Sequence, residues 1–343
     1  MAFENLSERE KKVLACLILY YVKSADPVGS RVIANKFRLG LSPATIRNTM
    51  QDLEELGLVQ QPHTSAGRIP TDAGYRIFVD RLIQQEQITE VERHAIESSI
   101  VPGAGLDSIL TQTSRVLADL SSQLGITLSP RMDESVLSHV ELVQMAEGKV
   151  LVVMAFRSGL ARSILVEVDA EIRLAELETM TRALNEKLAG LTLGQIHATV
   201  RERLAESIGN PRLLRLFVES DAEVWKNLGG DEMHIGGTNY IISQPEFADK
   251  GKLQDFLKLI ESRTGLIELL RDTPGSESGI VITIGAENKA REIQSCSVVT
   301  ATYQAGTTTG TISVIGPTRM PYARLTSLVR HAASQLSKVL KGS

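Results

Sequence analysis

The sequence of 343 residues contains little cysteine, few aromatic residues and no long apolar run. Its two cysteines, Cys16 and Cys296, are far apart and lack metal-ligand spacing, which argues against a disulfide framework or a zinc site. Aromatic residues make up only 4%, so there is little material for the base-stacking platforms of single-strand or RNA-binding proteins. No run of about 18 apolar residues is present and the N-terminus is charged, so we expect no membrane span, no signal peptide and a cytoplasmic protein.

Short motifs of common enzyme and nucleotide sites are also missing, including G-x-x-x-x-G-K-[ST], G-x-G-x-x-G, H-E-x-x-H and G-x-S-x-G. The six histidines are scattered without ligand spacing. Asp231-Glu232-Met233-His234 gathers ligand-type side chains, but glycines flank it on both sides, so we interpret it as a solvated turn. We therefore expect no metal, no cofactor and no enzymatic activity.

The net charge of -4 is distributed unevenly along the chain. Residues 1–83 contain 11 Lys and Arg against 9 Asp and Glu, whereas the remaining residues contain 26 against 32. No acidic residue occurs between Asp26 and Asp52, and none between Glu55 and Asp72. Polyanion binding therefore fits the N-terminal part better than the whole chain.

Hydrophobic spacing in the N-terminal part predicts helices at about 7–23 and 29–37 and a third helix from Ser42. Ser42 is a good N-cap and Pro43 fits the first helical position; the inward face is Ile46, Met50 and Leu53. After it we expect a short strand at 58–61, a loop at 63–68 and a helix at 71–99. This order is typical of a winged helix-turn-helix.

The front of the third helix carries no acid, although acids usually favour that end. Contact with DNA phosphates explains this, because a recognition helix enters the major groove with its N-terminal residues. Arg47 suits guanine, and Asn48 or Gln51 suits adenine. The candidate contacts to double-stranded DNA are Ser42, Ala44, Thr45, Arg47, Asn48 and Gln51 on the helix and His63, Ser65 and Arg68 on the loop. There, Gly67 permits close backbone approach, and Arg68 suits a phosphate or the minor groove.

Simpler interpretations of these residues remain open. Thr45, Asn48 and Gln51 could form an ordinary wetted helix face, and Arg47 could pair with Glu54 or Glu55. The basic residues Arg31, Lys36 and Arg38 fit ordinary surface charge equally well.

The rest of the chain predicts a mixed α and β structure, giving an α+β multidomain protein. Strand patterns occur at 136–146, 150–156 and 162–169, and again at 280–284, 297–303 and 311–315. A helix at about 106–124 precedes the first set, a helical stretch separates the two sets, and a C-terminal helix follows. This pattern favours an insertion into one sheet domain, although two domains in series would also fit. A helix-turn-helix protein usually binds DNA as a dimer, so we expect a homodimer formed through the acidic remainder.

Five stretches resemble one bacterial family, the heat-inducible transcription repressors HrcA. They are YxxSxxPVGS (21–30), LSPATIRNxMxDLE (41–54), GRxPTxxGYRxFVD (67–80), PEF (245–247) and IGxEN (284–288). The resemblance covers nearly the whole chain, and its N-terminal motifs are long and specific.

The resemblance implies three domains: a winged helix with a connecting helix (1–100), a GAF-like α/β sheet domain (106–170 and 276–343) and an inserted, mostly helical dimerisation domain with a small sheet (171–275). It also implies repression of chaperone operons of the groE and dnaK type through an inverted-repeat operator called CIRCE, with activity maintained by the chaperonin GroEL. One competing hypothesis is a ligand-responsive regulator whose GAF-like domain binds a metabolite. Another is an enzyme with an attached DNA-binding domain.

Overall fold

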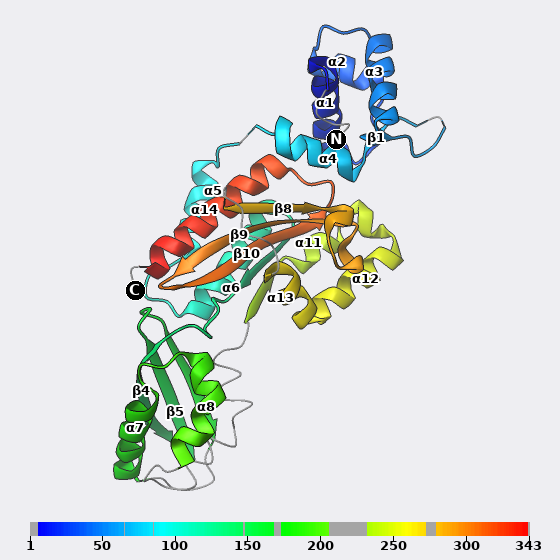
Figure 1. Ribbon diagram of the computed structural model, residues 1–343. Helices are drawn as coiled ribbons and strands as arrows, with labels where there is room; N and C mark the ends of the chain where they lie inside the picture. Colours follow the sequence, from blue (N-terminus) through cyan, green and yellow to red (C-terminus); the bar gives the residue numbers. More distant parts are fainter. Residues whose placement is uncertain are drawn as a thin grey trace.

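The computed structural model describes residues 6–64, 66–84, 86–146, 148–167, 173–205, 232–271 and 279–341. These residues form three units, arranged from top to bottom in Figure 1. We call them the winged-helix unit (from Leu6 to Ile83), the central unit around a five-stranded sheet and the lower unit around a three-stranded sheet. None of the described helices is long and apolar enough to cross a membrane.

Four helices and a short hairpin build the winged-helix unit, and the sequence predicts the start of each helix and the first strand. Its elements are α1 (Glu8–Ser24), α2 (Ser30–Phe37), α3 (Pro43–Glu55), β1 (Val59–Gln60), β2 (Ile69–Pro70) and α4 (Asp72–Ile77). The expected apolar stripes form one core, in which Val13, Leu17, Ile33, Ile46 and Leu53 are completely buried.

The single helix predicted over 71–99 is wrong. Helix α4 passes into a π-helical turn, η1 (Phe78–Leu82), and the backbone becomes extended at Ile83. A separate helix, α5 (Glu90–Ser99), then begins with a capping box in which Thr89 and Glu92 satisfy each other's backbone N–H groups. The apolar periodicity continues across the break, so it predicts one helix. The T-x-x-E pattern of Thr89 and Glu92 is the sequence signal that marks the start of the second helix.

The central unit is an antiparallel sheet of five strands in the order β7-β3-β10-β9-β8. The strands are β3 (Leu124–Leu128), β7 (Met233–Gly236), β8 (Ile280–Ile284), β9 (Cys296–Ala305) and β10 (Thr308–Pro317). The three strands predicted at 280–315 are confirmed, with β9 and β10 longer than expected. Strands β3 and β7 were not predicted, because five and four residues give too little pattern.

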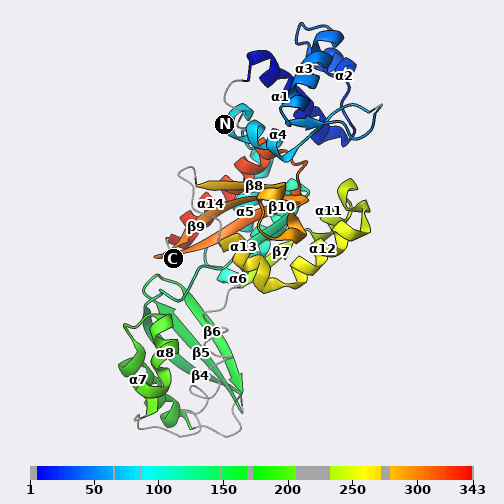
Figure 2. The same cartoon turned by 45° about the vertical axis from the view of Figure 1, so that its right-hand side comes forward.

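Helices cover both faces of this sheet (Figure 2). On one face α6 (Leu106–Ser121) and α14 (Tyr322–Lys341) pack over inward residues such as Val314 and Val299, and α5 packs against these two helices. On the other face lie α11 (Thr238–Ile242), α12 (Lys250–Glu261) and α13 (Arg263–Arg271), which share a core with Val298 and Ile315. Because the two sets alternate along β9 and β10, each strand contributes to both cores.

In the lower unit, two helices pack on a sheet of the order β4-β5-β6. The elements are β4 (Leu137–Ala146), β5 (Lys149–Phe156), β6 (Ala161–Glu167), α7 (Leu174–Leu188) and α8 (Leu193–Ala205). The side chain of Asn185 on α7 binds both the N–H and the C=O of Val140, so it fixes the helix to β4.

These pairings correct the predicted domain boundaries. Within 106–170, only β3 joins the sheet formed by 280–317, while β4–β6 pair with one another in a separate sheet. Residues 232–271, placed in the insertion by the sequence, instead contribute β7 and three helices to the central unit. A strand pattern shows which residues face a core, but it does not show which sheet the strand joins.

Candidate nucleic-acid interface

Helix α3 begins at the residues that the sequence predicts. The hydroxyl of Ser42 accepts a hydrogen bond from the Thr45 N–H at 3.1 Å and lies 2.9 Å from the Thr45 hydroxyl. Pro43 occupies the first turn, which contains no acid. Ile46, Met50 and Leu53 are buried as predicted, which fixes the rotation of the helix and thus the residues that face solvent.

The outward edge of α3 consists of Ser42, Ala44, Arg47, Asn48 and Gln51, all of which are exposed, with Thr45 half-buried beside them. No acidic side chain in the described part of the chain pairs with Arg47, so the alternative in which Glu54 or Glu55 neutralises it does not hold in this structure. Gln51 makes one long contact, 3.5 Å from its Nε2 to Glu55 Oε1. The edge thus offers a free guanidinium and two amides to a partner.

The loop between β1 and β2 forms the wing. The Gln61 side-chain amide donates to the carbonyls of Thr64 and Ala66 at 2.9 and 3.0 Å, which closes the loop on itself. His63 is exposed, in keeping with a role at the tip, whereas Ser65 lies outside the described residues. Sequence reasoning missed Gln61, because a single glutamine in a loop carries no pattern.

Arg68 has a different environment from the one its sequence position suggests. Its Nε and Nη2 lie 2.9 and 2.7 Å from Glu54 Oε2, and only 19% of its side chain is exposed. Glu54 also accepts the N–H of Gln61 at 3.1 Å, so one carboxylate at the end of α3 holds both sides of the wing. This accounts for an acid at the far end of the helix. In this structure the contacts of Arg68 with Glu54 position the wing. The role of Arg68 as a DNA contact stays a prediction.

Gly67 is needed for close packing within the protein. The backbones of Val28 and Arg68 exchange two hydrogen bonds, of 2.8 and 2.9 Å, which tie the wing to the start of α2. A Cβ on Gly67 would lie 2.4 Å from the Val28 carbonyl, a distance that no ordinary contact allows. The close backbone approach expected at Gly67 is therefore an approach to Val28.

Together, α3, the start of α2 and the wing enclose a hollow of about 370 Å³. Its lining includes Gly29 and Ser30 at the start of α2, Arg47 on α3, and Gln61 and Thr64 on the wing. Arg31, Lys36 and Arg38 are exposed on or next to α2. The hollow is polar and carries Arg47 at its wall, so it can accept an anionic group.

One cluster of metal-type side chains occurs among the described residues, away from this surface. Asp107, Glu232 and His234 place ligand atoms within 4.8 Å of one another, so the solvated turn predicted for 231–234 is wrong from Glu232 onward. Arg162 Nη1 lies 2.9 Å from Glu232 Oε2 and 3.5 Å from Asp107 Oδ1, so a protein cation already neutralises the carboxylates. Burial and the neighbouring Asp107 raise the pKa of Glu232. This cluster joins β6 of the lower unit to α6 and β7 of the central unit.

Comparisons with known proteins agree along the whole chain. A family model described as winged helix-turn-helix transcription repressor, HrcA DNA-binding, matches residues 5–84, and one described as HrcA protein C terminal domain matches residues 107–326. The heat-inducible transcription repressor HrcA of Chlorobium phaeobacteroides is 38% identical over 352 residues, covering 99% of this chain and 100% of the relative. That of Geobacter sulfurreducens is 38% identical over 341 residues, covering 98% and 99%.

Among solved structures, the crystal structure of a hypothetical protein at 2.2 Å resolution superposes with a TM-score of 0.72. It is 23% identical, and the match covers 98% of this chain and 99% of that chain. The two chains therefore share a fold over nearly the whole length of this chain.

Proposed function

Because the chain belongs to the HrcA family of heat-inducible transcription repressors, we propose that it represses heat-shock chaperone operons of the groE and dnaK type through an inverted-repeat operator of the CIRCE kind. The proposal rests on the exposed, acid-free front of α3 with its unpaired Arg47, set beside a wing. Such an edge can enter the major groove, where Arg47, Asn48 and Gln51 have the hydrogen-bonding groups to read bases. A repressor of this kind acts at the bacterial chromosome, in the cytoplasm.

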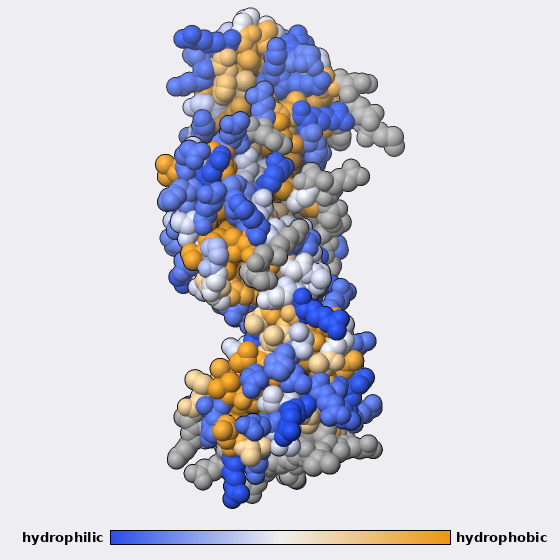
Figure 3. Space-filling view, turned by 90° about the vertical axis from the view of Figure 1, so that its left-hand side faces the viewer, coloured by the Kyte–Doolittle hydropathy of each residue, from blue (hydrophilic) through white to orange (hydrophobic). Residues whose placement is uncertain are grey.

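An inverted repeat requires two recognition helices related by a two-fold axis, so the working form in this proposal is a homodimer. The lower unit supplies a surface that supports it, since an apolar row crosses the face of its sheet opposite α7. Val143, Leu151 and Leu165 lie side by side across β4, β5 and β6 on that face, and Val143 and Leu165 are 40% and 51% exposed. Figure 3 shows hydrophobic patches on the surface of the lower unit.

We further propose that the chaperonin GroEL maintains the DNA-binding form, as the family resemblance implies. A chain of three units, each with its own sheet, contains many contacts that are distant in sequence, and such chains fold slowly and expose apolar surface on the way. After dilution from denaturant, we expect added chaperonin and ATP to raise the fraction of protein that binds operator. Complete recovery without chaperonin would contradict this part.

Footprinting of the purified protein on chaperone promoters of its host tests the function directly. We expect protection of both arms of an inverted repeat and a log affinity that falls linearly with log salt concentration. The control DNA carries one scrambled arm and should bind more weakly. Equal affinity for operator and scrambled DNA would overturn the proposed function, because backbone contacts alone give no sequence preference.

A further inference from the structure

Several residues of the recognised motifs lie far from the DNA-facing edge, at the border between the winged-helix and central units. Arg76 on α4 bridges this border. Its Nε donates to Glu287 Oε1 at 2.8 Å and its Nη2 donates to the Ile282 carbonyl at 2.7 Å and to the second Glu287 oxygen. Its Nη1 is held by Asp80 at 3.1 Å on its own side. All three guanidinium nitrogens are therefore engaged, in a planar arrangement that permits one orientation.

A second arginine, Arg319, bridges the same border at another point. Its Nε donates to Glu246 Oε1 at 2.6 Å, and its Nη2 donates to Gln244 Oε1 at 3.1 Å. Its Nη1 donates to the carbonyl of Val22 at 2.7 Å, in the last turn of α1. Only 11% of the Arg319 side chain is exposed. Arg319 thus joins α1 to the central unit, as Arg76 joins α4.

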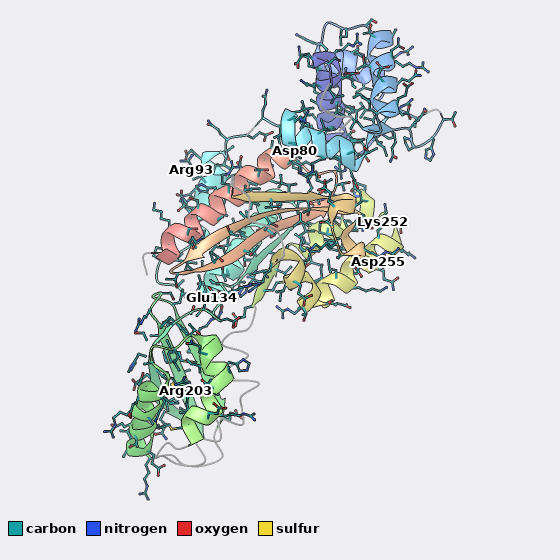
Figure 4. The ribbon with its side chains drawn as sticks, viewed as in Figure 1. Asp80, Arg93, Glu134, Arg203, Lys252 and Asp255 are labelled. Carbon is teal, nitrogen blue, oxygen red and sulfur yellow. The ribbon has the colours of Figure 1, made fainter. Side chains whose placement is uncertain are left out.

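Other contacts accompany the two arginines. The carboxylate of Asp72, at the start of α4, accepts the N–H of Ala286 at 2.9 Å, and the rings of Tyr75 and Tyr322 lie 5.8 Å apart. Beside them the packing is interrupted by a hollow of about 400 Å³ between η1, β8 and α14. Figure 4 shows Asp80 at this border, where α4 meets β8 and α14. Directed polar contacts at separate points therefore contribute to the angle between the units, alongside the apolar core.

This angle matters for reading an inverted repeat. In a dimer the distance between the two α3 helices must match the separation of the half-sites, about 34–36 Å or a multiple of it. A rotation of roughly 10° shifts any point that lies about 20 Å from the axis by about 3.5 Å, which matches the 3.4 Å rise of one base pair. A winged helix that rotates freely would therefore fit several spacings equally well.

We propose that Arg76 and Arg319 are positioning residues that set the angle of the winged helix and thereby the half-site spacing that the dimer recognises. The proposal rests on the proposed operator binding and adds to it the source of spacing selectivity. Arg76 acts on the angle through Glu287 and the Ile282 carbonyl, and Arg319, held in place by Glu246, acts through the Val22 carbonyl. Neither arginine belongs to the DNA-facing edge.

Spacing selectivity is measured by mobility shift on inverted repeats whose spacer varies in steps of one base pair. We expect the parent protein to prefer one spacer. The Arg76→Ala and Arg319→Ala variants should bind the best spacer about tenfold more weakly, with the preference over neighbouring spacers reduced, while affinity for a single half-site stays the same. Glu287→Gln should also reduce the preference for the best spacer over its neighbours, but less strongly than the alanine variants. Arg93→Ala, which removes an exposed pair on α5, is the matched control.

An unchanged spacer profile in both alanine variants would overturn the proposal. Arg76→Ala could also lose half-site binding and melt at a lower temperature, which would indicate a folding defect. In that case Glu287→Gln is the test, and an unchanged spacer profile in that variant would overturn the proposal. A purely structural role would lower all affinities in parallel and leave the profile intact.

A spin-label measurement separates this proposal from the proposed function. Cys16 and Cys296 are buried, so labels can be placed at the exposed positions Arg31→Cys on α2 and Lys252→Cys on α12. We expect one narrow distance distribution in the parent and a broader one after Arg76→Ala, with no DNA present. Failure of the parent to bind any inverted repeat overturns the function alone, whereas equal distributions overturn the positioning role.

Discussion

At the scale of single residues, Arg47 is the side chain with most to gain from a partner, because it is exposed and no described acid pairs with it. A bidentate contact to a base discriminates by about 1–3 kcal/mol. Arg47→Ala should therefore weaken operator binding by about 5- to 150-fold and relax the preference at one base pair of each arm. Competition with operators mutated one position at a time measures both effects. A variant that keeps the full preference of the parent would remove Arg47 from the interface.

Arg68 leads to the opposite expectation, since its guanidinium is bound to Glu54. Arg68→Ala should lower the melting temperature, because it leaves the partly buried Glu54 carboxylate without its partner. The slope of log affinity against log salt should stay the same. A phosphate contact would instead reduce that slope by about 0.9. Comparing salt titrations of the parent, Arg68→Ala and the exposed control Arg93→Ala on α5 distinguishes the two roles.

At the scale of elements, local signals predict helices well and sheet partners poorly. Ser42 and Pro43 fix the start of α3 because capping is a contact between near neighbours. The ion pair of Arg68 with Glu54 and the bridge from Arg76 to Glu287 join residues 14 and 211 positions apart, so no local pattern contains them. For the same reason the sequence indicates the exposed residues at the front of α3, but it does not indicate the contacts of Glu54 that hold the wing. The separation of the β4–β6 sheet from the central sheet was likewise out of reach, because it depends on contacts between distant residues.

The position of the wing depends on its close packing against the start of α2. Gly67→Ala would place a methyl group 2.4 Å from the Val28 backbone, and overpacking of this kind costs about 1–3 kcal/mol. We expect a lower melting temperature and weaker operator binding through displacement of the wing. Gly29→Ala is the matched control, because its Cβ would meet no atom within 4 Å. Equal losses in the two variants would contradict this explanation.

At the scale of the whole molecule, the junction of the central and lower units gives stability a pH dependence. Burial lowers the pKa of His234 below its usual value of 6.5, helped by the nearby Arg162 and Arg263 and opposed by Asp107. Below pH 6.5 the unfolded chain therefore binds a proton that the folded chain does not, and stability falls as the pH decreases. Thermal unfolding between pH 7.5 and 5.5 should show a shallower decline in His234→Asn than in the parent or in the exposed control His94→Asn. If the melting temperature falls equally with pH in all three proteins, His234 at this junction is not a source of the pH dependence.

The proposed homodimer requires an interface, and we expect it on the outer face of the β4–β6 sheet. An apolar row of Val143, Leu151 and Leu165 continues to Met145, which is 60% exposed. Leu165→Glu places a charge on the β6 side of this face, and burying it against a second copy would be costly. Sedimentation should show a monomer, and operator affinity should fall to that of a single half-site. Leu174→Glu on α7, where the leucine is 66% exposed, should stay dimeric. A dimeric Leu165→Glu variant would place the interface elsewhere, and the spacing that Arg76 and Arg319 set would then be measured from a different two-fold axis.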